Sequence, residues 1–346
     1  MQVYTPALTN RGDRDIIIIR TNNNELEVLF MTTDKRKVVL VGTGMVGMSF
    51  AYSLVNQGAI CNELVLIDLN KVRANGEAMD LNHGLAFAKS NMKIYAGEYS
   101  DCKDADIVVI AAGVAQKEGE TRLDLLKRNT EVFRSIITPV VKSGFDGIFV
   151  VATNPVDIMT RVTYELSRFG AGRVIGTGTS LDTARLRYLL GEYFTVDPKN
   201  IHAYVIGEHG DSEFVPFSQV MLATKKVTEI FEGKSGYCLD DMKKIEDEVR
   251  TAAYKIIEAK QATYYGIGIA LTRIVKAILG DENSVVTVSA KLCGEYGAKD
   301  VFIGVPTIIG RNGVKEILEL NLSEEEKGKF TNSVSVLQEA FDGLNL

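Results

Sequence analysis

Short, continuous apolar runs alternate with helical stretches along the chain from residue 37 onward. Four runs are rich in aliphatic and β-branched residues, as in strands that are buried on both faces: 38–41, 64–67, 107–111 and 148–151. Helical stretches separate them, among them 123–142, which we expect to bend at Pro139. This alternation predicts an α/β chain with a doubly wound parallel sheet.

The pattern is more mixed in the second half of the chain. We expect these elements there: an apolar run at 201–206, a helix at 242–262, short strands near Val285 and Val301, and a final helix after Ser323. A length of 346 residues fits two domains of ordinary size. We therefore predict a Rossmann-type parallel-sheet domain at 34–176 and a mixed α+β domain at 177–346.

The N-terminal residues do not match this pattern. Residues 26–30 (LEVLF) resemble the front half of a protease site used in expression vectors, and Met31 resembles a second start. We expect 1–33 to be an extra or vector-derived segment, with a natural extension as the alternative.

Composition narrows the possible partners and the location. The chain has 39 basic and 45 acidic residues, a net charge of −6, which argues against a nucleic-acid partner. Its four cysteines are scattered without a CxxC pair, which is typical of reduced thiols in a cytoplasmic protein and indicates neither disulfides nor a metal site. No apolar run approaches the ~18 residues of a membrane span, so we expect no membrane association.

A glycine-rich turn follows the first strand of the regular pattern. Residues 42–47 have the sequence GTGMVG, and an acidic residue, Asp68, follows the next strand. In such a turn Gly42 permits the tight bend, Gly44 lets a pyrophosphate approach the backbone, and Gly47 lets the helix pack on the sheet. Asp68 can bind the ribose hydroxyls and repels a 2′-phosphate, which predicts NAD rather than NADP as the cofactor. The alternative is a structural glycine turn in an α/β protein that binds another ligand.

Candidate acid–base residues lie in two further motifs. His209 is flanked by glycines in GEHGDS, and a histidine suits proton transfer near neutral pH. Asp182 and Arg185 lie three residues apart at the start of an expected helix, so they share one face. A carboxylate there can orient the imidazole, and an arginine can bind a substrate carboxylate through two N–H groups. The loop 113–122 can close as a lid.

These motifs resemble the lactate/malate dehydrogenase family, and within it the bacterial L-lactate dehydrogenases. The resemblance runs from about residue 37 to the C-terminus through GTGMVG, IDLN, MDLNHG, GETRLDLLKRN, VATNPVD, GTSLDTAR and GEHGDS. It implies hydride transfer between NADH and pyruvate, with His209 as acid–base, Asp182 as its partner and Arg122 polarising the carbonyl. Substrate binding is implied for Arg185, Arg122, Asn154 and Thr263. The positions implied to contact NAD are Val46, Asp68, Arg73, Tyr99, Gly113, Val114, Ser135, Ala152, Asn154 and Thr177.

The lid residue Gln116 bears on the choice of substrate. The family's malate enzymes carry arginine at this position to bind the second carboxylate of oxaloacetate, whereas Gln116 is neutral. Burying an unpaired carboxylate costs several kcal/mol, so pyruvate is favoured. A dehydrogenase for larger apolar 2-hydroxy acids, a malate dehydrogenase and a non-enzymatic NAD-binding protein are the alternatives.

Arg187 and His202 form a candidate regulatory site. Arg187 lies two residues past Arg185, so the two side chains point to nearly opposite helix faces. In bacterial relatives that respond to fructose 1,6-bisphosphate, a matching arginine and histidine bind this activator between subunits. The resemblance also implies a homotetramer. The alternative is a surface arginine and an unrelated histidine.

Overall fold

The computed structural model describes residues 15–20, 26–31, 36–58, 60–89, 91–114, 119, 121–233 and 238–344. The chain divides into two units, residues 1–36 and Lys37–Leu346. In the first unit β1 (Asp15–Arg20) pairs antiparallel with β2 (Leu26–Met31). The second unit carries all the predicted site residues.

Six parallel strands form the central part of the second unit's main sheet. In chain order they are β3 (Lys37–Val41), β4 (Glu63–Ile67), β5 (Lys93–Ala96), β6 (Ile107–Ile110), β7 (Ile148–Val151) and β8 (Val174–Gly176). Their spatial order is β8-β7-β6-β3-β4-β5, so the strand order reverses beside β3. β3, β6, β7 and β8 are buried along their whole length, as their continuous apolar runs predict. The predicted doubly wound α/β fold is confirmed.

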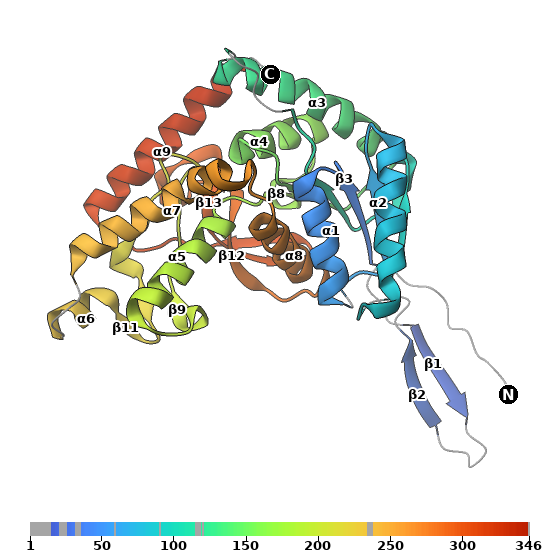
Figure 1. Ribbon diagram of the computed structural model, residues 1–346, viewed down its shortest axis with the longest axis horizontal. Helices are drawn as coiled ribbons and strands as arrows, with labels where there is room; N and C mark the ends of the chain where they lie inside the picture. Colours follow the sequence, from blue (N-terminus) through green and yellow to red (C-terminus); the bar gives the residue numbers. More distant parts are fainter. Residues whose placement is uncertain are drawn as a thin grey trace. The chain divides into compact units, whose positions relative to one another are not determined.

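Four helices connect these strands (Figure 1): α1 (Met45–Gln57), α2 (Lys71–Gly84), α3 (Arg122–Lys142) and α4 (Val156–Ser167). α1 ends at Gly58, which has a positive φ of 66°, as expected for a glycine after a helix. Pro139 lies inside α3, where it removes one backbone donor. α1 packs against α8 (Tyr265–Leu279), and α3 packs against α4.

Three antiparallel strands extend the sheet to nine strands: β12 (Ser284–Cys293), β13 (Lys299–Gly310) and β14 (Gly313–Ile317). β12 joins the parallel part through the pair Ser289 and Gly176. The prediction of short strands here was wrong, since β12 has 10 residues and β13 has 12. Gly304 and Pro306 interrupt the apolar pattern of β13 and hide its length in the sequence.

A smaller second core lies around α5 (Ser180–Phe194) and α7 (Leu239–Lys260). A three-stranded sheet borders it: β9 (Ile201–His202), β10 (Met221–Leu222) and β11 (Lys225–Lys226). The apolar run 201–206 is therefore a strand only at its first two residues, while Ile206 pairs with Phe214 in an isolated bridge. The helix predicted at 242–262 is α7, which begins three residues earlier.

The remaining helices complete this half of the chain. α6 spans Val227–Gly233, and α9 (Glu324–Asp342) begins after Ser323 as predicted, with Ser323 and Glu326 capping each other's backbone N–H groups. Short 3₁₀ helices occur at Leu85–Phe87, Tyr99–Asp104, Ala171–Arg173, Pro198–Asn200, Phe217–Gln219 and Glu295–Gly297. Within the part of the chain that the structure describes, every helix is too short or too polar to cross a membrane.

Candidate active site

The glycine turn between β3 and α1 is shaped by contacts that exclude side chains. Gly42 has a φ of 102°, and a methyl group there would lie 2.7 Å from the backbone nitrogen of Ala112. A methyl group on Gly47 would lie 2.0 Å from the carbonyl oxygen of Gly42, so Gly47 lets α1 begin directly against the turn. A methyl group on Gly44, by contrast, would meet no described heavy atom within 4 Å, which leaves the backbone of Gly44 open to a ligand.

Asp68 lies at the end of β4, next to this turn. One carboxylate oxygen, Oδ2, accepts hydrogen bonds from the backbone nitrogen of Thr43 at 2.8 Å and from its hydroxyl at 2.9 Å. The other, Oδ1, accepts one from the backbone nitrogen of Asn70 at 2.9 Å. Partial burial acts to raise the pKa of Asp68, but these hydrogen bonds outweigh it and hold the pKa below its ordinary value. Asp68 is thus an oriented carboxylate that fits the ribose of NAD.

The other predicted NAD positions gather mainly where the parallel strands end. Tyr99 follows β5, Gly113 and Val114 follow β6, Ala152 and Asn154 follow β7, and Thr177 follows β8. Neighbouring parallel strands end at the same edge of the sheet, which is where ligands bind in doubly wound folds. Val46 lies in the first turn of α1. Arg73 and Ser135 lie on exposed faces of α2 and α3, where their contacts are with their own helices.

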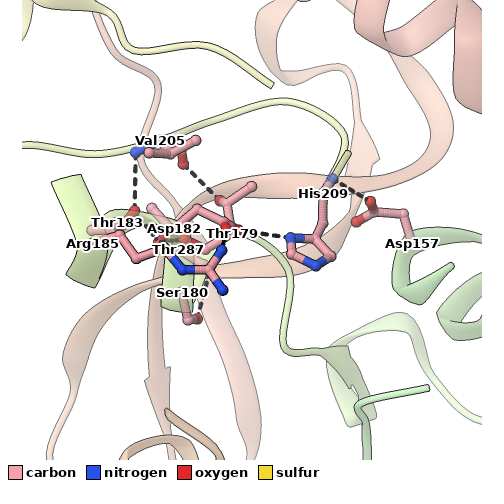
Figure 2. A network of polar contacts seen from close by, with 9 residues as sticks. All are labelled: Asp157, Thr179, Ser180, Asp182, Thr183, Arg185, Val205, His209 and Thr287. Carbon is pink, nitrogen blue, oxygen red and sulfur yellow. Dashed lines mark hydrogen bonds and ion pairs between the residues drawn. The ribbon is translucent and has the colours of Figure 1, made fainter. Parts of the chain in front are cut away.

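His209, Asp182 and Arg185 form a contiguous charged cluster (Figure 2). Nδ1 of His209 lies 2.6 Å from Oδ2 of Asp182, and Nη1 of Arg185 donates a hydrogen bond to Oδ1 of Asp182 at 2.7 Å. The two basic groups therefore use separate oxygens of one carboxylate. Asp182 is almost fully buried, while a quarter of the His209 side chain is exposed.

The start of α5 is fixed by three hydroxyl side chains (Figure 2). The hydroxyl of Thr179 donates to the carbonyl of Val205 at 2.6 Å, and that of Ser180 donates to the carbonyl of Thr287 at 2.7 Å. The Thr183 hydroxyl accepts from the Val205 backbone nitrogen at 2.9 Å. These contacts set the first turn of α5, from which Asp182 and Arg185 project, against the segment that leads to His209.

The loop that carries His209 is held by a carboxylate from α4. The backbone nitrogen of His209 donates to Oδ2 of Asp157 at 2.8 Å, and Asp157 follows the cis peptide bond between Asn154 and Pro155. Burial raises the pKa of Asp157 to about 6, although the His209 N–H and the Ser289 hydroxyl act in the opposite direction. Asp157 lies in a motif noted from the sequence, but its role was missed there because its contact with His209 joins segments 52 residues apart.

The charges in this cluster favour a protonated histidine. Burial acts to lower the pKa of His209, but the charge of Asp182 and its hydrogen bond outweigh burial and raise the pKa to about 9. Burial likewise acts to raise the pKa of Asp182, and the positive charges of His209 and Arg185 lower it on balance. At neutral pH the site therefore holds an imidazolium beside an ionised carboxylate.

Glu213 belongs to the same cluster and was not predicted. Asp182, His209 and Glu213 each offer an atom of a kind that binds metals, and these atoms lie within 4.8 Å of one another. Because Arg185 already contacts Asp182, the protein itself supplies positive charge here, and the set suits acid–base chemistry. The one sequence signal for Glu213 is its place directly after GEHGDS, and an acidic residue there would ordinarily be expected to be exposed.

The remaining predicted site residues are placed as follows. Thr263 is half-buried between α7 and α8, and Arg122 is the first residue of α3. Gln116 lies outside the described residues. Nε of Arg187 donates to the carbonyl of Ala203 at 3.0 Å, so Arg187 lies against the segment that begins at the exposed His202.

This combination defines a class of enzyme. A turn that fits a dinucleotide lies in the first half of the chain, and an imidazolium that can give up a proton lies beside an arginine in the second half. Reduction of a carbonyl by a nicotinamide cofactor requires a hydride, a proton and a group to hold the substrate. The fold and the site together are those of an NAD-dependent dehydrogenase.

Comparisons with known proteins identify the family. Residues 36–176 match the NAD-binding domain of lactate/malate dehydrogenases, and residues 179–344 match the α/β C-terminal domain of the same family. The chain belongs to the lactate/malate dehydrogenase family, and its similarity is to bacterial L-lactate dehydrogenases. It is 56% identical over 303 residues to L-lactate dehydrogenase 2 of Bacillus anthracis, and the match covers 88% of this chain and 96% of that protein.

Solved structures agree with this assignment. A lactate dehydrogenase, MGS-M5, from a Medee basin deep-sea metagenome library matches with a TM-score of 0.89 at 49% identity, covering 90% of this chain and 99% of that one. The minor L-lactate dehydrogenase of Enterococcus mundtii in its ligands-bound form matches with a TM-score of 0.88 at 50% identity, with the same coverage of both chains. The predicted family and NAD as the cofactor are confirmed.

Proposed function

We propose that this chain interconverts pyruvate and L-lactate with NAD, and that His209 is the proton donor in pyruvate reduction. The observation that carries the assignment of roles is the arrangement of His209 and Arg185 on separate oxygens of the buried Asp182. This arrangement supplies a proton and a carboxylate-binding group side by side. The high identity to curated L-lactate dehydrogenases supports the same reaction.

Arg185 is proposed to hold the substrate carboxylate. A guanidinium has five N–H donors, and Arg185 directs one of its terminal nitrogens, Nη1, at Asp182. A carboxylate can accept two parallel hydrogen bonds from such a group, which fixes the orientation of the keto acid as well as binding it. The ketone oxygen is then directed toward His209, the neighbour of Arg185 on the same carboxylate.

His209 is proposed to donate its proton from Nε2, because Nδ1 faces Asp182. NADH, when bound at the Gly42–Gly47 turn, supplies the hydride for the ketone carbon. Negative charge then develops on the ketone oxygen, and the proton on His209 neutralises it. Asp182 remains ionised throughout and stabilises the imidazolium, while Asp157 holds the backbone of His209 in place.

The residues of the lid are proposed to complete the site. Arg122 would polarise the ketone, and Asn154 and Thr263 would line the pocket, as the resemblance implies. The neutral Gln116 would exclude the second carboxylate of oxaloacetate. NADH oxidation measured side by side with pyruvate, oxaloacetate and a branched 2-keto acid tests this proposal. We expect the fastest NADH oxidation with pyruvate. Faster oxidation with either of the other two keto acids would contradict the proposed role of Gln116.

We propose that the chain assembles as a homotetramer in the cytoplasm. Large apolar side chains are exposed on and beside α2, among them Leu69 (95% exposed), Val72 (84%) and Phe87 (94%). Apolar side chains grouped in this way favour burial against another subunit. Sedimentation equilibrium should give the mass of four chains, and Val72→Glu should lower it. A monomeric mass for the unmodified chain would contradict the proposal.

We also propose that fructose 1,6-bisphosphate activates the enzyme through Arg187 and His202. The contact of Arg187 with Ala203 brings its guanidinium to the segment that carries His202, which supports a joint anion site. Pyruvate saturation curves should shift to lower concentration with the bisphosphate, and Arg187→Gln should abolish the shift. Unchanged curves for the unmodified enzyme across pH would contradict the proposal.

A further inference from the structure

Glu213 places a third carboxyl group at the acid–base site. It lies four residues after His209, is 7% exposed, and has a carboxyl oxygen within 4.8 Å of the corresponding atoms of Asp182 and His209. Two carboxyl groups already serve His209, since Asp182 contacts its ring and Asp157 contacts its backbone. Glu213 therefore adds an acidic group to a buried site that must also bind an anionic substrate.

The cations around Glu213 form their ion pairs with other carboxylates. Arg185 donates to Asp182 at 2.7 Å, and Arg250 of α7 lies 3.0 Å from Asp247. His209 has its Nδ1 on Asp182. Among the residues that the structure describes, the carboxyl group of Glu213 has no ion pair within 4.0 Å and no side-chain hydrogen bond. An ionised Glu213 would thus be a buried carboxylate without a direct partner.

Both burial and neighbouring charge oppose ionisation of this group. Burial raises the pKa of Glu213 to about 9, and the negative charge of Asp182 acts in the same direction, while His209, Arg185 and Arg250 act against it. The same cluster raises the pKa of His209 to about 9. At neutral pH two protons therefore reside within a few ångströms of the place proposed for the substrate.

We propose that Glu213 must carry a proton for a keto acid to bind, and that its ionisation closes the site to anionic substrates at alkaline pH. The inference rests on the proposed function, because it needs the substrate carboxylate on Arg185, whose charge acts on Glu213. A neutral Glu213 leaves Arg185 to attract this carboxylate, whereas an ionised one repels it at short range. Glu213 acts here as a residue that sets the charge of the site and takes no part in the proton transfer.

The consequence is a second proton linked to substrate binding. His209 must be protonated to hold the ketone oxygen, which links one proton to binding, and Glu213 adds another. By linkage, the slope of log Kd against pH equals the number of protons taken up on binding. Above pH 9 the slope should therefore exceed one and approach two, whereas protonation of His209 alone limits it to one.

The test measures binding of oxamate, an unreactive isostere of pyruvate, to the enzyme saturated with NADH, followed by NADH fluorescence from pH 7 to 10.5. In Glu213→Gln the slope should not exceed one, because His209 is then the one group of this pair that still links a proton to binding. Glu246→Gln is the matched control. Glu246 is a half-buried glutamate on α7 that accepts a hydrogen bond from the Val215 backbone, and its substitution should leave the slope unchanged.

A second measurement needs no variant. Proton uptake on oxamate binding by the unmodified enzyme, from calorimetry in buffers of different ionisation enthalpy, should exceed one proton per site near pH 9.5. Equal slopes in the unmodified enzyme and Glu213→Gln, or an uptake of one proton or less, would overturn the inference about Glu213. Failure of oxamate to bind at pH 7, with NADH binding intact, would instead overturn the proposed function.

Discussion

Replacing Asp182 by asparagine tests the proposed acid–base pair most directly. The substitution keeps the size of the side chain and removes the charge that His209 and Arg185 share. The pKa of His209 is raised from 6.5 to about 9, against the effect of burial, and the charge of Asp182 is the largest favourable cause. At ~1.4 kcal/mol per pKa unit, this rise of about 2.5 corresponds to about 3 kcal/mol of stabilisation of the imidazolium.

The direction of the effect on activity follows from the sign of this shift. In the proposed reaction, pyruvate reduction needs protonated His209, so activity should be present below the pKa of His209 and be lost as pH rises through it. In the unmodified enzyme kcat/KM for pyruvate should hold to near pH 9. In Asp182→Asn the buried imidazole loses its main source of stabilisation, so the fall should begin at or below about pH 6.5, and kcat/KM at pH 7.5 should drop at least about 10-fold.

The assay is steady-state NADH oxidation with pyruvate from pH 5 to 10, with NADH affinity measured by fluorescence as the control. Because Asp68 and the Gly42–Gly47 turn lie outside the altered cluster, NADH binding should stay within about twofold of normal. An Asp182→Asn enzyme that lost activity at all pH values but kept the alkaline limit near pH 9 would refute the reasoning. Asp182 would then position the substrate without controlling the pKa of His209.

Three further substitutions test separate parts of the site. Arg185→Lys keeps the charge but loses the paired N–H donors, so KM for pyruvate should rise about 10- to 100-fold; an unchanged KM would place the substrate carboxylate elsewhere. Gln116→Arg should raise kcat/KM for oxaloacetate relative to pyruvate at least about 10-fold, and an unchanged ratio would exclude Gln116 from the substrate pocket. Thr43→Val removes the hydroxyl bond to Asp68 and should weaken NADH binding about fivefold in fluorescence titrations, with Thr43→Ser close to normal; equal binding by both variants would show that the backbone bond suffices.

The parallel half of the fold could be predicted from the sequence because each strand there is a continuous buried run that ends at a glycine or polar turn. The strands β3, β6 and β7 can be predicted from their own residues, without knowing which strands they pair with. The antiparallel half was harder to predict. β13 contains a glycine and a proline that look like breaks, yet its pairing with β12 on one side and β14 on the other holds it as a strand throughout. Tertiary pairing, which the local pattern does not report, sets its length.

The candidate site also divides into features that the sequence predicts and features that only the fold defines. The contact between Asp182 and Arg185 follows from their spacing on one helix, and the placement of Asp68 after β4 follows from the turn motif. Thr43 and Asp157 were missed because their partners come from distant segments, Asp68 at 25 positions from Thr43 and His209 at 52 positions from Asp157. Glu213 was missed because its burial beside Asp182 and His209 is set by the fold. A local sequence pattern identifies catalytic side chains more readily than the residues that position these side chains or set their protonation state. Only the fold brings residues of the second kind to the site.

In the proposed mechanism, the carboxylate of Asp182 couples substrate binding by Arg185 to proton donation by His209. Asp182 can stay ionised while buried because one cation lies on each of its oxygens, so it cannot lose either contact without a cost of several kcal/mol. A substrate carboxylate that pairs with Arg185 adds negative charge near His209 and raises the affinity of its imidazole for the proton. His209 would therefore hold its proton most firmly when the keto acid is bound and not yet reduced. The negative charge that reduction develops on the substrate oxygen would make this oxygen the stronger base, and it would then accept the proton of His209.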